Sequence, residues 1–372
     1  MNKLLINISL LLPFSAMTGC SPTSIYTNSP LLISEVYFGE LVSEAIELYN
    51  CSEDDIDLSN YSIDIYRNAE KEASYHIDLE GILKPYNTYV IANSSASEEV
   101  INKANIVTDQ YRNNGVYPVV LKYGNTVMDI VGSVGYSVDY AHGHSLVRKV
   151  DYMQGKNVFD AYDFIRYNPL NIDLLGNATN TVTPDELLEG PKLDEKYLSY
   201  PYSSSSLLGG GGAVQVQLDH SIDGDTTSFI YPNYLLDELG IRQRTSMRYQ
   251  NVDTPESTLE QDPWGKAASS FTMNLLYENI NELYVQSCLG GALHETYGRL
   301  LGFVWAGDTL INYALVLNGY SYLLQNEFME MSYKGISYYS FMYNAELLAS
   351  RQGLKIHGEL DPNWDYELDV PL

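Results

Sequence analysis

The stretch AVQVQLDHSIDGDTTSFIY (residues 213–231) carries the pattern that decides the fold of the C-terminal part of the chain. Within Ala213–Leu218, valine and leucine alternate with glutamine, which is the pattern of a strand with one buried face. Thr226–Tyr231 is a second strand candidate, and the short polar sequence with Asp223 and Asp225 between them is typical of a turn. The sequence therefore predicts two strands with a pair of carboxylates where the chain reverses.

Three further strands and three helices are predicted after this stretch. The strand candidates are Thr245–Val252, Leu283–Cys288 and Leu300–Trp305. Apolar residues recur at helical spacing from Ala268, Ile311 and Ala345, and a glycine suited to a C-cap follows each of the last two segments. Five strands with three helices suit a small closed barrel of the OB type, so we expect an α+β unit of that kind over residues 213–366.

The N-terminal part of the chain has the pattern of a second β-rich unit. Short alternating or β-branched runs are separated by turn residues at intervals of roughly 8–14 positions, which is typical of an antiparallel sandwich. These runs are Leu32–Phe38, Ala45–Tyr49, Tyr61–Tyr66, Thr88–Ala92, Val119–Tyr123 and Val127–Val131. We place this unit at residues 31–182. Residues 183–212 cluster proline, serine and glycine without apolar periodicity, which predicts a flexible linker.

Length and charge limit what the chain can be. Its 372 residues fit two domains, and an apolar fraction of 45% fits folded cores. The formal net charge is −27, and residues 213–372 alone contain 21 acidic and 8 basic side chains. This balance excludes generic binding to phosphate backbones through an overall basic field. Any chemistry on nucleic acid would need a local cationic site or a bound metal.

Acidic and arginine residues of the C-terminal unit form a set suited to phosphodiester hydrolysis. Asp225 and Asp253, from separate strands, are candidates to hold a hard divalent cation through oxygen ligands. Arg248 and Arg299 are candidates to bind the phosphate, because the guanidinium group donates parallel hydrogen bonds and stays charged. Glu256 is the candidate general base for the attacking water.

These motifs, together with PWGKAASSF (263–271) and ETYGR (295–299), resemble the staphylococcal-nuclease-like (thermonuclease) family. The resemblance implies that Asp225, Asp253 and the Thr254 carbonyl bind Ca²⁺, and that Glu256 is the general base. It also implies that Arg248 and Arg299 bind phosphate and that Tyr297 packs against the bound nucleotide. The implied reaction is calcium-dependent endonucleolysis of DNA and RNA that leaves 3′-phosphate ends. The family usually has aspartate where this chain has Glu295.

The N-terminal unit resembles the lamin-tail family. The segments that carry the resemblance are LLISEVYFGE (31–40), AIELYNCSEDDIDLSNYSIDIY (45–66), GILKPYNTYVIANSSA (81–96) and NNGVYPVVLKYGNTVMDIVG (113–132). The resemblance implies an immunoglobulin-like sandwich that serves as a binding or positioning module for a partner that is unknown. It does not imply catalysis.

The first twenty residues have the features of a targeting segment. Lys3 precedes an apolar stretch, Leu4–Met17, that is too short to span a bilayer. The sequence Met17-Thr18-Gly19-Cys20 resembles a bacterial lipoprotein box, which implies a signal peptide over residues 1–20 and a lipid on Cys20. We therefore expect a lipid anchor on the extracytoplasmic face of the cell membrane. An ordinary cleaved signal with a chance cysteine is the alternative.

Two functional hypotheses of different classes follow. The first is a surface-anchored, calcium-dependent nuclease, which the complete set of acids and arginines favours. The second is a catalytically silent surface-binding or adhesin lipoprotein that uses the same folds as interaction modules, and the acidic balance of the chain favours it slightly. A third, weaker hypothesis makes partner recognition by the lamin-tail-like unit the main function. Chelation of calcium would separate the first two, because only the nuclease would lose an activity.

Overall fold

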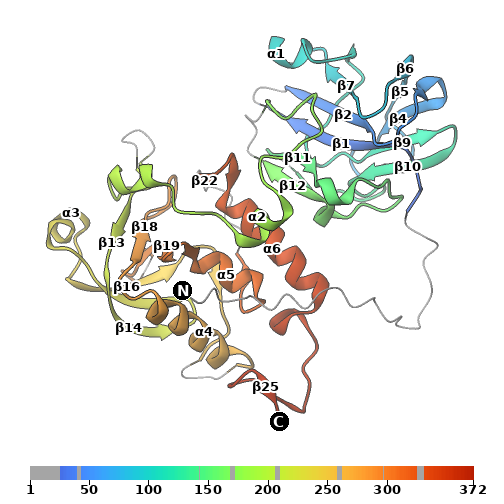
Figure 1. The fold of residues 1–372 in the computed structure, drawn as a ribbon. Helices are drawn as coiled ribbons and strands as arrows, with labels where there is room; N and C mark the ends of the chain where they lie inside the picture. Colours follow the sequence, from blue (N-terminus) through green and yellow to red (C-terminus); the bar gives the residue numbers. More distant parts are fainter. Residues whose placement is uncertain are drawn as a thin grey trace.

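The computed structural model describes residues 26–39, 43–141, 143–167, 172–205, 210–257, 262–295, 297–324 and 331–372. These residues form two β-rich units that meet along helix α6 (Tyr338–Gln352) and the strands facing it (Figure 1). No helix within the described part of the chain is long and apolar enough to cross a membrane. The predicted signal peptide and Cys20 lie outside the described residues.

The first unit is a sandwich of two sheets. The larger sheet has the order β12-β11-β1-β2-β7-β8 and the smaller one β10-β9-β4-β5. All neighbouring strands in both sheets are antiparallel except β7 and β8. The elements are β1 (Leu31–Phe38), β2 (Glu44–Asn50), β3 (Ile56–Asp57), β4 (Tyr61–Ile65), β5 (Tyr75–Asp78), β6 (Ile82–Leu83), β7 (Thr88–Asn93), α1 (Glu98–Ile101), β8 (Ile106–Thr108), β9 (Val119–Tyr123), β10 (Thr126–Val131), β11 (Ser145–Arg148) and β12 (Phe164–Tyr167).

The alternation in the predicted runs places one row of side chains between the two sheets. Ile33 and Ile46 of the larger sheet pack in one cluster with Ile63 and Leu121 of the smaller sheet. The opposite face of the larger sheet is covered by α1 and by Leu175. All six predicted runs coincide with strands within one or two residues at each end.

A buried ion network ties the two sheets together. Arg148 of β11 donates from Nη2 to Asp129 Oδ2 of β10 at 2.5 Å, and both side chains are at most 1% exposed. The Asp129 carboxylate also accepts hydrogen bonds from the backbone N–H groups of Ile33 and Lys156. The Lys156 amine pairs in turn with the buried Asp163 at 2.6 Å. Each charge in this network therefore has an oppositely charged partner, which burial requires.

The second unit is built on a sheet with the order β13-β18-β19-β16-β15-β14, and β20 pairs with β19. β16 and β19 are parallel, and the other neighbours are antiparallel. The strands are β13 (Ala213–Gln215), β14 (Gln217–Asp223), β15 (Thr226–Ile230), β16 (Arg244–Tyr249), β17 (Val252–Asp253), β18 (Leu283–Gln286), β19 (Leu300–Ala306) and β20 (Thr309–Leu310). The paired strands form an open path, so a closed five-stranded barrel stays a prediction. Only Val216 separates the two end strands in the sequence.

Helices cover this sheet at the predicted places. The helices are α3 (Leu236–Leu239), α4 (Gly265–Glu278), α5 (Ile311–Leu317) and α6, and the short strands are β21 (Tyr322–Leu323), β22 (Ser332–Tyr333), β23 (Ile336–Ser337), β24 (Trp364–Asp365) and β25 (Val370–Pro371). Helix α6 begins where the Ser337 side chain accepts from the Ser340 N–H, and it ends at Gly353, which is left-handed with φ of +60°. Its buried face packs with Trp305 and Phe303 of β19 in the core of the unit.

The flexible linker predicted for residues 183–212 is wrong over its described part. Thr183 and Glu186 form a capping box, and Pro184 stands in the first turn, so this segment begins helix α2 (Pro184–Glu189). Leu187 and Tyr197 are buried in the core of the second unit, and so is Tyr202. The apolar anchors lie ten and five positions apart, which matches neither the period of a helix nor that of a strand. Their burial makes the segment part of the second unit.

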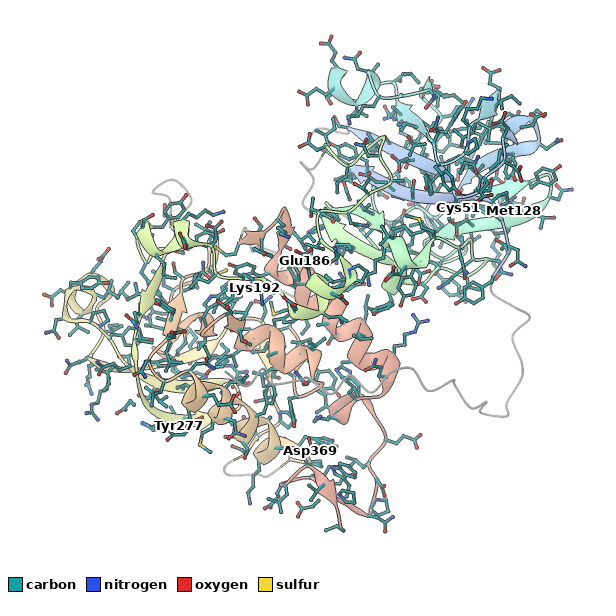
Figure 2. All side chains as sticks on the ribbon, viewed as in Figure 1. Cys51, Met128, Glu186, Lys192, Tyr277 and Asp369 are labelled. Atoms are coloured by element: carbon teal, nitrogen blue, oxygen red, sulfur yellow. The ribbon has the colours of Figure 1, made fainter. Side chains whose placement is uncertain are left out.

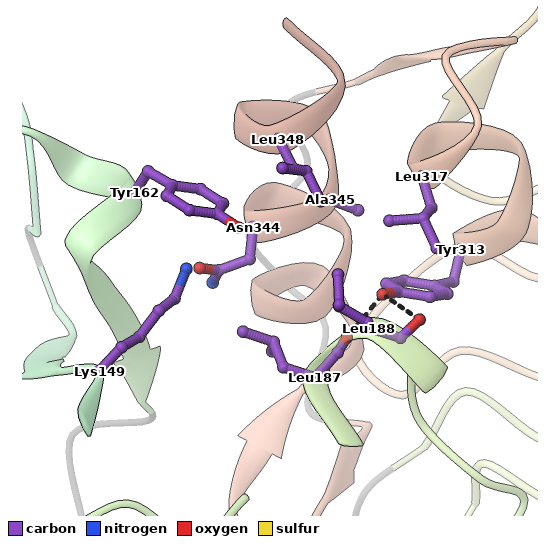
Figure 3. A pocket seen from close by; sticks show the side chains of 9 residues that line it. All are labelled: Lys149, Tyr162, Leu187, Leu188, Tyr313, Leu317, Asn344, Ala345 and Leu348. Atoms are coloured by element: carbon purple, nitrogen blue, oxygen red, sulfur yellow. Dashed lines mark hydrogen bonds between the residues drawn. The ribbon is translucent and has the colours of Figure 1, made fainter. Parts of the chain in front are cut away.

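The two units share a packed interface. Val147 and Tyr167 of the first unit lie in the same apolar cluster as the core of the second unit. The Arg351 guanidinium pairs with Asp160 across the interface at 2.9 Å. A small cavity lies there between the first unit, α2, α5 and α6 (Figure 3). Lys149 and Asn344 line it, and their side chains point toward one another.

Lys149 is the charge at this interface that burial affects most. Its side chain is 4% exposed, its amine lies 3.6 Å from the centre of the Tyr162 ring, and no described atom accepts a hydrogen bond from it. Burial lowers the pKa of Lys149 to about 7, with the Asp163 and Asp160 carboxylates opposing the shift and Arg351 adding to it. The folded chain thus binds this proton less tightly than the unfolded chain does.

Replacing Lys149 with methionine should stabilise the chain most at low pH. Between about pH 7 and the ordinary lysine pKa the unfolded state holds the proton and the folded state does not, so this group makes the free energy of unfolding rise with pH. Below pH 7 the full cost of burying the charge is present. We expect Lys149→Met to raise the melting temperature by about 2 °C or more at pH 6, with a smaller gain at pH 9. Thermal melts beside the exposed control Lys71→Met check this, and equal gains at both pH values would contradict it.

Candidate active site

The turn between β14 and β15 brings the first carboxylates of the site together. Asp225 follows Gly224 in this turn and is 1% exposed, although it carries a carboxylate. The Thr272 hydroxyl of α4 donates to the Gly224 carbonyl at 2.6 Å, which fixes the turn against the helix. A Cβ on Gly224 would lie 2.8 Å from the Thr254 hydroxyl, so only glycine allows this close packing.

Arg248 connects this turn to the next acidic segment. It lies in β16, where it is opposite Thr226 of β15 in the strand register. One guanidinium nitrogen donates to Asp225 Oδ1, and the other donates to Asp253 Oδ1 at 2.6 Å and to the Val252 carbonyl at 3.3 Å. The two predicted metal-binding aspartates are therefore bridged by the predicted phosphate-binding arginine.

The loop after β17 packs its first residues on the buried carboxylate. The Thr254 backbone N–H donates to Asp225 Oδ2 at 2.8 Å, and the Thr254 hydroxyl donates to the same oxygen at 3.1 Å. Two residues later, Glu256 is exposed to solvent at the edge of the site. Its backbone is fixed by a hydrogen bond from the Asp262 N–H to the Glu256 carbonyl at 3.0 Å.

The second arginine approaches from the turn before β19. The Arg299 guanidinium makes a two-point ion pair with Glu295, with 2.9 Å between Nη2 and Oε2. Arg299 also donates from Nη1 to the Thr226 hydroxyl at 3.5 Å. Tyr297, in the same turn, is 87% exposed. The Arg299 guanidinium therefore reaches Thr226, next to the turn between β14 and β15, while Tyr297 is exposed to solvent.

These elements surround an open hollow of about 410 Å³ with a strongly polar lining. Its lining residues are Ile222, Asp223, Asp225, Thr226, Arg248, Glu256, Glu295 and Arg299. Four of the predicted site residues line this hollow: the first aspartate, both arginines and the glutamate. Asp253 and Thr254 do not line the hollow but contact the lining residues Arg248 and Asp225, and Tyr297 is not among the lining residues.

Sequence reasoning missed two carboxylates of the lining. The sequence predicts a turn at Asp223 and a departure from the family pattern at Glu295, and it gives neither carboxylate a role in the site. A signal for Asp223 was present, because it stands two positions before Asp225 at the same predicted chain reversal. For Glu295 the signal was the spacing of four residues to Arg299, at which opposite charges often pair.

Burial and like charges raise the pKa of two acids of the hollow, Asp225 and Glu256. The pKa of Asp225 is raised, first by burial, while the Arg248 charge opposes the shift. The pKa of Glu256 is also raised, by desolvation and by the negative charge of Asp223. The ion pair with Glu295 raises the pKa of Arg299. A carboxylate with a raised pKa is a stronger base, which suits Glu256 to accept a proton from water.

The donor set of the hollow suits a hard cation, although its ligands are not gathered into one sphere. Across the described ranges, no group of three histidine, cysteine or acidic side chains is close enough to hold a metal ion. The Arg248 guanidinium pairs with both predicted metal-binding aspartates, Asp225 and Asp253. The lining still contains four carboxylates against two guanidinium groups, and oxygen donors with a net negative charge are what Ca²⁺ prefers.

Comparison with known proteins identifies both units. Residues 25–136 match the family model of the lamin tail domain, and residues 246–354 match that of the staphylococcal nuclease homologues. The chain is 34% identical over 101 residues to the thermonuclease of Staphylococcus intermedius, covering 26% of this chain and 52% of that protein. It is 28% identical over 146 residues to endonuclease YncB of Bacillus subtilis (strain 168), covering 38% of this chain and 62% of that protein.

The chain thus carries a lamin-tail domain followed by a staphylococcal-nuclease domain, and these similarities support a nuclease. It spans about half to three fifths of the length of the two relatives. The nuclease match begins at residue 246, so Arg248, Glu256 and Arg299 lie inside it and Asp225 lies before it.

Proposed function

We propose that the chain is a calcium-dependent endonuclease that hydrolyses the phosphodiester bonds of DNA and RNA and leaves 3′-phosphate ends. The observation that carries this proposal is the hollow in which two arginines and a carboxylate with a raised pKa face the same open space. A phosphodiester carries negative charge on the oxygens that do not react, and its hydrolysis needs that charge neutralised and a water activated.

The residues of the hollow divide this work among them. Arg248 and Arg299 bind the phosphate oxygens, which requires each guanidinium to exchange a carboxylate partner for the substrate. Glu256 accepts the proton of the attacking water at its carboxylate, and the open edge of the hollow admits that water. Asp223 supports this role, because its charge raises the pKa of Glu256.

Asp225, Asp253 and the Thr254 carbonyl would hold the calcium ion, which supplies positive charge to the phosphate when it is bound. Asp225 is the strongest candidate, because it is buried beside the hollow and both of its oxygens are held in place by donors. Tyr297, which is exposed next to Arg299, would pack against the nucleotide.

Replacing Asp225 with asparagine should weaken calcium binding by about tenfold or more, because one hard anionic ligand is lost. The amide keeps an oxygen that accepts from Thr254, so the fold of the turn should survive. Calcium titrations followed by calorimetry and by DNA cleavage check this. The exposed Asp237→Asn in the same unit is the control, and equal calcium affinity in both variants would refute the assignment.

The reaction itself is tested by the ends of its products. The full chain is incubated with linear duplex DNA, single-stranded DNA and RNA, with calcium or with a chelator, and the new ends are analysed. We expect internal cleavage of each polynucleotide, products with 3′-phosphate ends, and no cleavage in the presence of the chelator. Cleavage that leaves 5′-phosphate ends, or that continues with the chelator, would overturn the proposed reaction.

We further propose that a lipid on Cys20 anchors the protein on the extracytoplasmic face of a cell membrane. The lipobox-like sequence at residues 17–20 supports this. In the expressing bacterium, Cys20→Ser should release the protein from the membrane fraction.

Two further parts of the proposal concern the units themselves. The lamin-tail domain would position the nuclease or bind a partner. The nuclease unit would close as an OB-type barrel through the continuous β13–β14 segment.

A further inference from the structure

The last residues of the chain form a hairpin outside the nuclease match. β24 and β25 pair antiparallel, with Trp364 opposite Pro371 and Asp365 opposite Val370. The Asp365 carboxylate accepts hydrogen bonds from the backbone N–H groups of Glu367 and Leu368, which shapes the connecting turn. This segment, residues 361–371, is called the C-terminal hairpin below. It follows residue 354, where the match to the nuclease family ends.

The C-terminal hairpin lies beside α4 (Figure 1). Its aromatic side chains pack on Trp264, at the start of that helix. Tyr366 meets the Trp264 ring edge to face, with 4.8 Å between ring centres, and Trp364 lies 6.3 Å from the same ring. Lys266, in the first turn of α4, pairs with Glu367 at 2.8 Å. Trp264 is 8% exposed, so these rings contribute to its cover.

A second anchor holds the other arm of the hairpin. Asp369, labelled in Figure 2, accepts a hydrogen bond from the Tyr320 hydroxyl at 2.8 Å and pairs with Lys355 at 3.4 Å. The Lys355 amine lies 4.4 Å from the centre of the Tyr320 ring and 5.8 Å from that of Trp264. Both arms of the hairpin are thus fixed around the same tryptophan.

Trp264 stands next to the backbone that carries Glu256. It adopts a left-handed conformation with φ of +71° at the N-terminus of α4, which costs free energy for a residue other than glycine. Its neighbour Gly265 packs so closely that an added Cβ would lie 2.2 Å from the Glu256 carbonyl oxygen. Asp262 binds the Glu256 backbone on both sides, through its own N–H and through its carboxylate.

We propose that the C-terminal hairpin positions Glu256 by clamping Trp264, so that the start of α4 stays against the Glu256 backbone. The proposal rests on the proposed function only for the role of Glu256. The aromatic contacts offset the strained backbone of Trp264, and Gly265 and Asp262 then hold the Glu256 backbone in place. None of the described residues of the hairpin is among those that line the hollow, so the proposal makes them positioning residues.

The test uses the full chain and the double variant Trp364→Ala/Tyr366→Ala. Amide hydrogen exchange measures this backbone directly, and we expect exchange over residues 252–257 and 262–266 to rise between about three- and tenfold, as loss of aromatic pairs allows local opening. In the same samples, kcat for DNA cleavage should fall by about tenfold while KM stays within about twofold, because misplacing a reacting group slows the chemical step.

Two further variants keep the test independent of a general loss of stability. Tyr366→Phe keeps the ring on Trp264, so its amide exchange and its kcat should both stay close to the wild-type values. Leu368→Ala, on the 71% exposed tip of the same hairpin, should change neither. Unchanged exchange of the loop in the double variant would overturn the proposal, and so would a loosened loop with unchanged kcat. If the unaltered chain does not cleave DNA, the proposed function fails, while the exchange data still decide whether the hairpin holds the loop.

Discussion

Replacing Arg299 with alanine should lower kcat for DNA cleavage by about 10²–10³-fold, the usual cost of removing one group that stabilises charge in the transition state. Arg299 reaches the hollow from the turn before β19 and is the arginine whose ion pair lies within its own turn. Its guanidinium can therefore turn to the phosphate without disturbing the carboxylates around Asp225. Steady-state kinetics under saturating calcium measure the effect.

Two further variants test whether the fall in kcat comes from the loss of the Arg299 guanidinium. Arg299→Lys keeps the charge but loses the planar pair of donors, so it should recover only part of the activity. Arg242→Ala removes an exposed arginine of the same unit outside the hollow and should leave kcat unchanged. If Arg299→Ala cleaves DNA as fast as the wild type, the hollow is not the active site.

Replacing Asp129 with alanine should destabilise the first unit by about 3–5 kcal/mol, because it leaves the Arg148 charge buried without this partner. The side chains of the pair are at most 1% exposed, and the Asp129 carboxylate also binds two backbone N–H groups from separate segments. Besides backbone carbonyls, the Arg148 guanidinium pairs with the Asp163 carboxylate, which lies 3.6 Å away and already pairs with Lys156.

The matched control is Asp55→Ala, which breaks the ion pair with Lys84 on the surface of the same unit. That pair is 2.6 Å long, but its side chains are 63% and 49% exposed, so its loss should cost less than about 1 kcal/mol. The comparison is made by urea denaturation of both variants, in which a spectroscopic signal that reports on the first unit is monitored. Equal losses in the two variants would show that burial of the Arg148 pair contributes no more than a surface pair.

The strands of the sandwich were predictable from their short β-branched and apolar runs, even where both faces of a strand are buried. The runs around Ile33, Ile63 and Leu121 alternate because the sandwich core takes every second side chain, and sequence shows that period directly. Residues 183–205 were not predictable in this way. Their anchors, Leu187 and Tyr197, are isolated apolar residues among prolines and serines, and only the capping box at Thr183 marked a helix start.

The candidate residues of the site could be predicted from the sequence, but the contacts between them could not. Sequence order makes Asp225, Arg248, Glu256 and Arg299 candidates, and the structure gathers these four around one hollow. The bridging of two aspartates by Arg248 depends on the register of β15 and β16, which a motif does not specify. The clamp on Trp264 depends on a chain reversal about one hundred residues later in the sequence, where no periodic signal exists.

One measurement tests the nuclease assignment most directly. Plasmid DNA is incubated with the full chain, with calcium and with a chelator, beside Glu256→Ala under the same conditions. We predict calcium-dependent conversion of supercoiled plasmid to nicked and then linear DNA by the wild type, and a loss of about 10²-fold or more in the variant. Equal cleavage by both proteins, or none by the wild type with any divalent cation, would contradict the assignment.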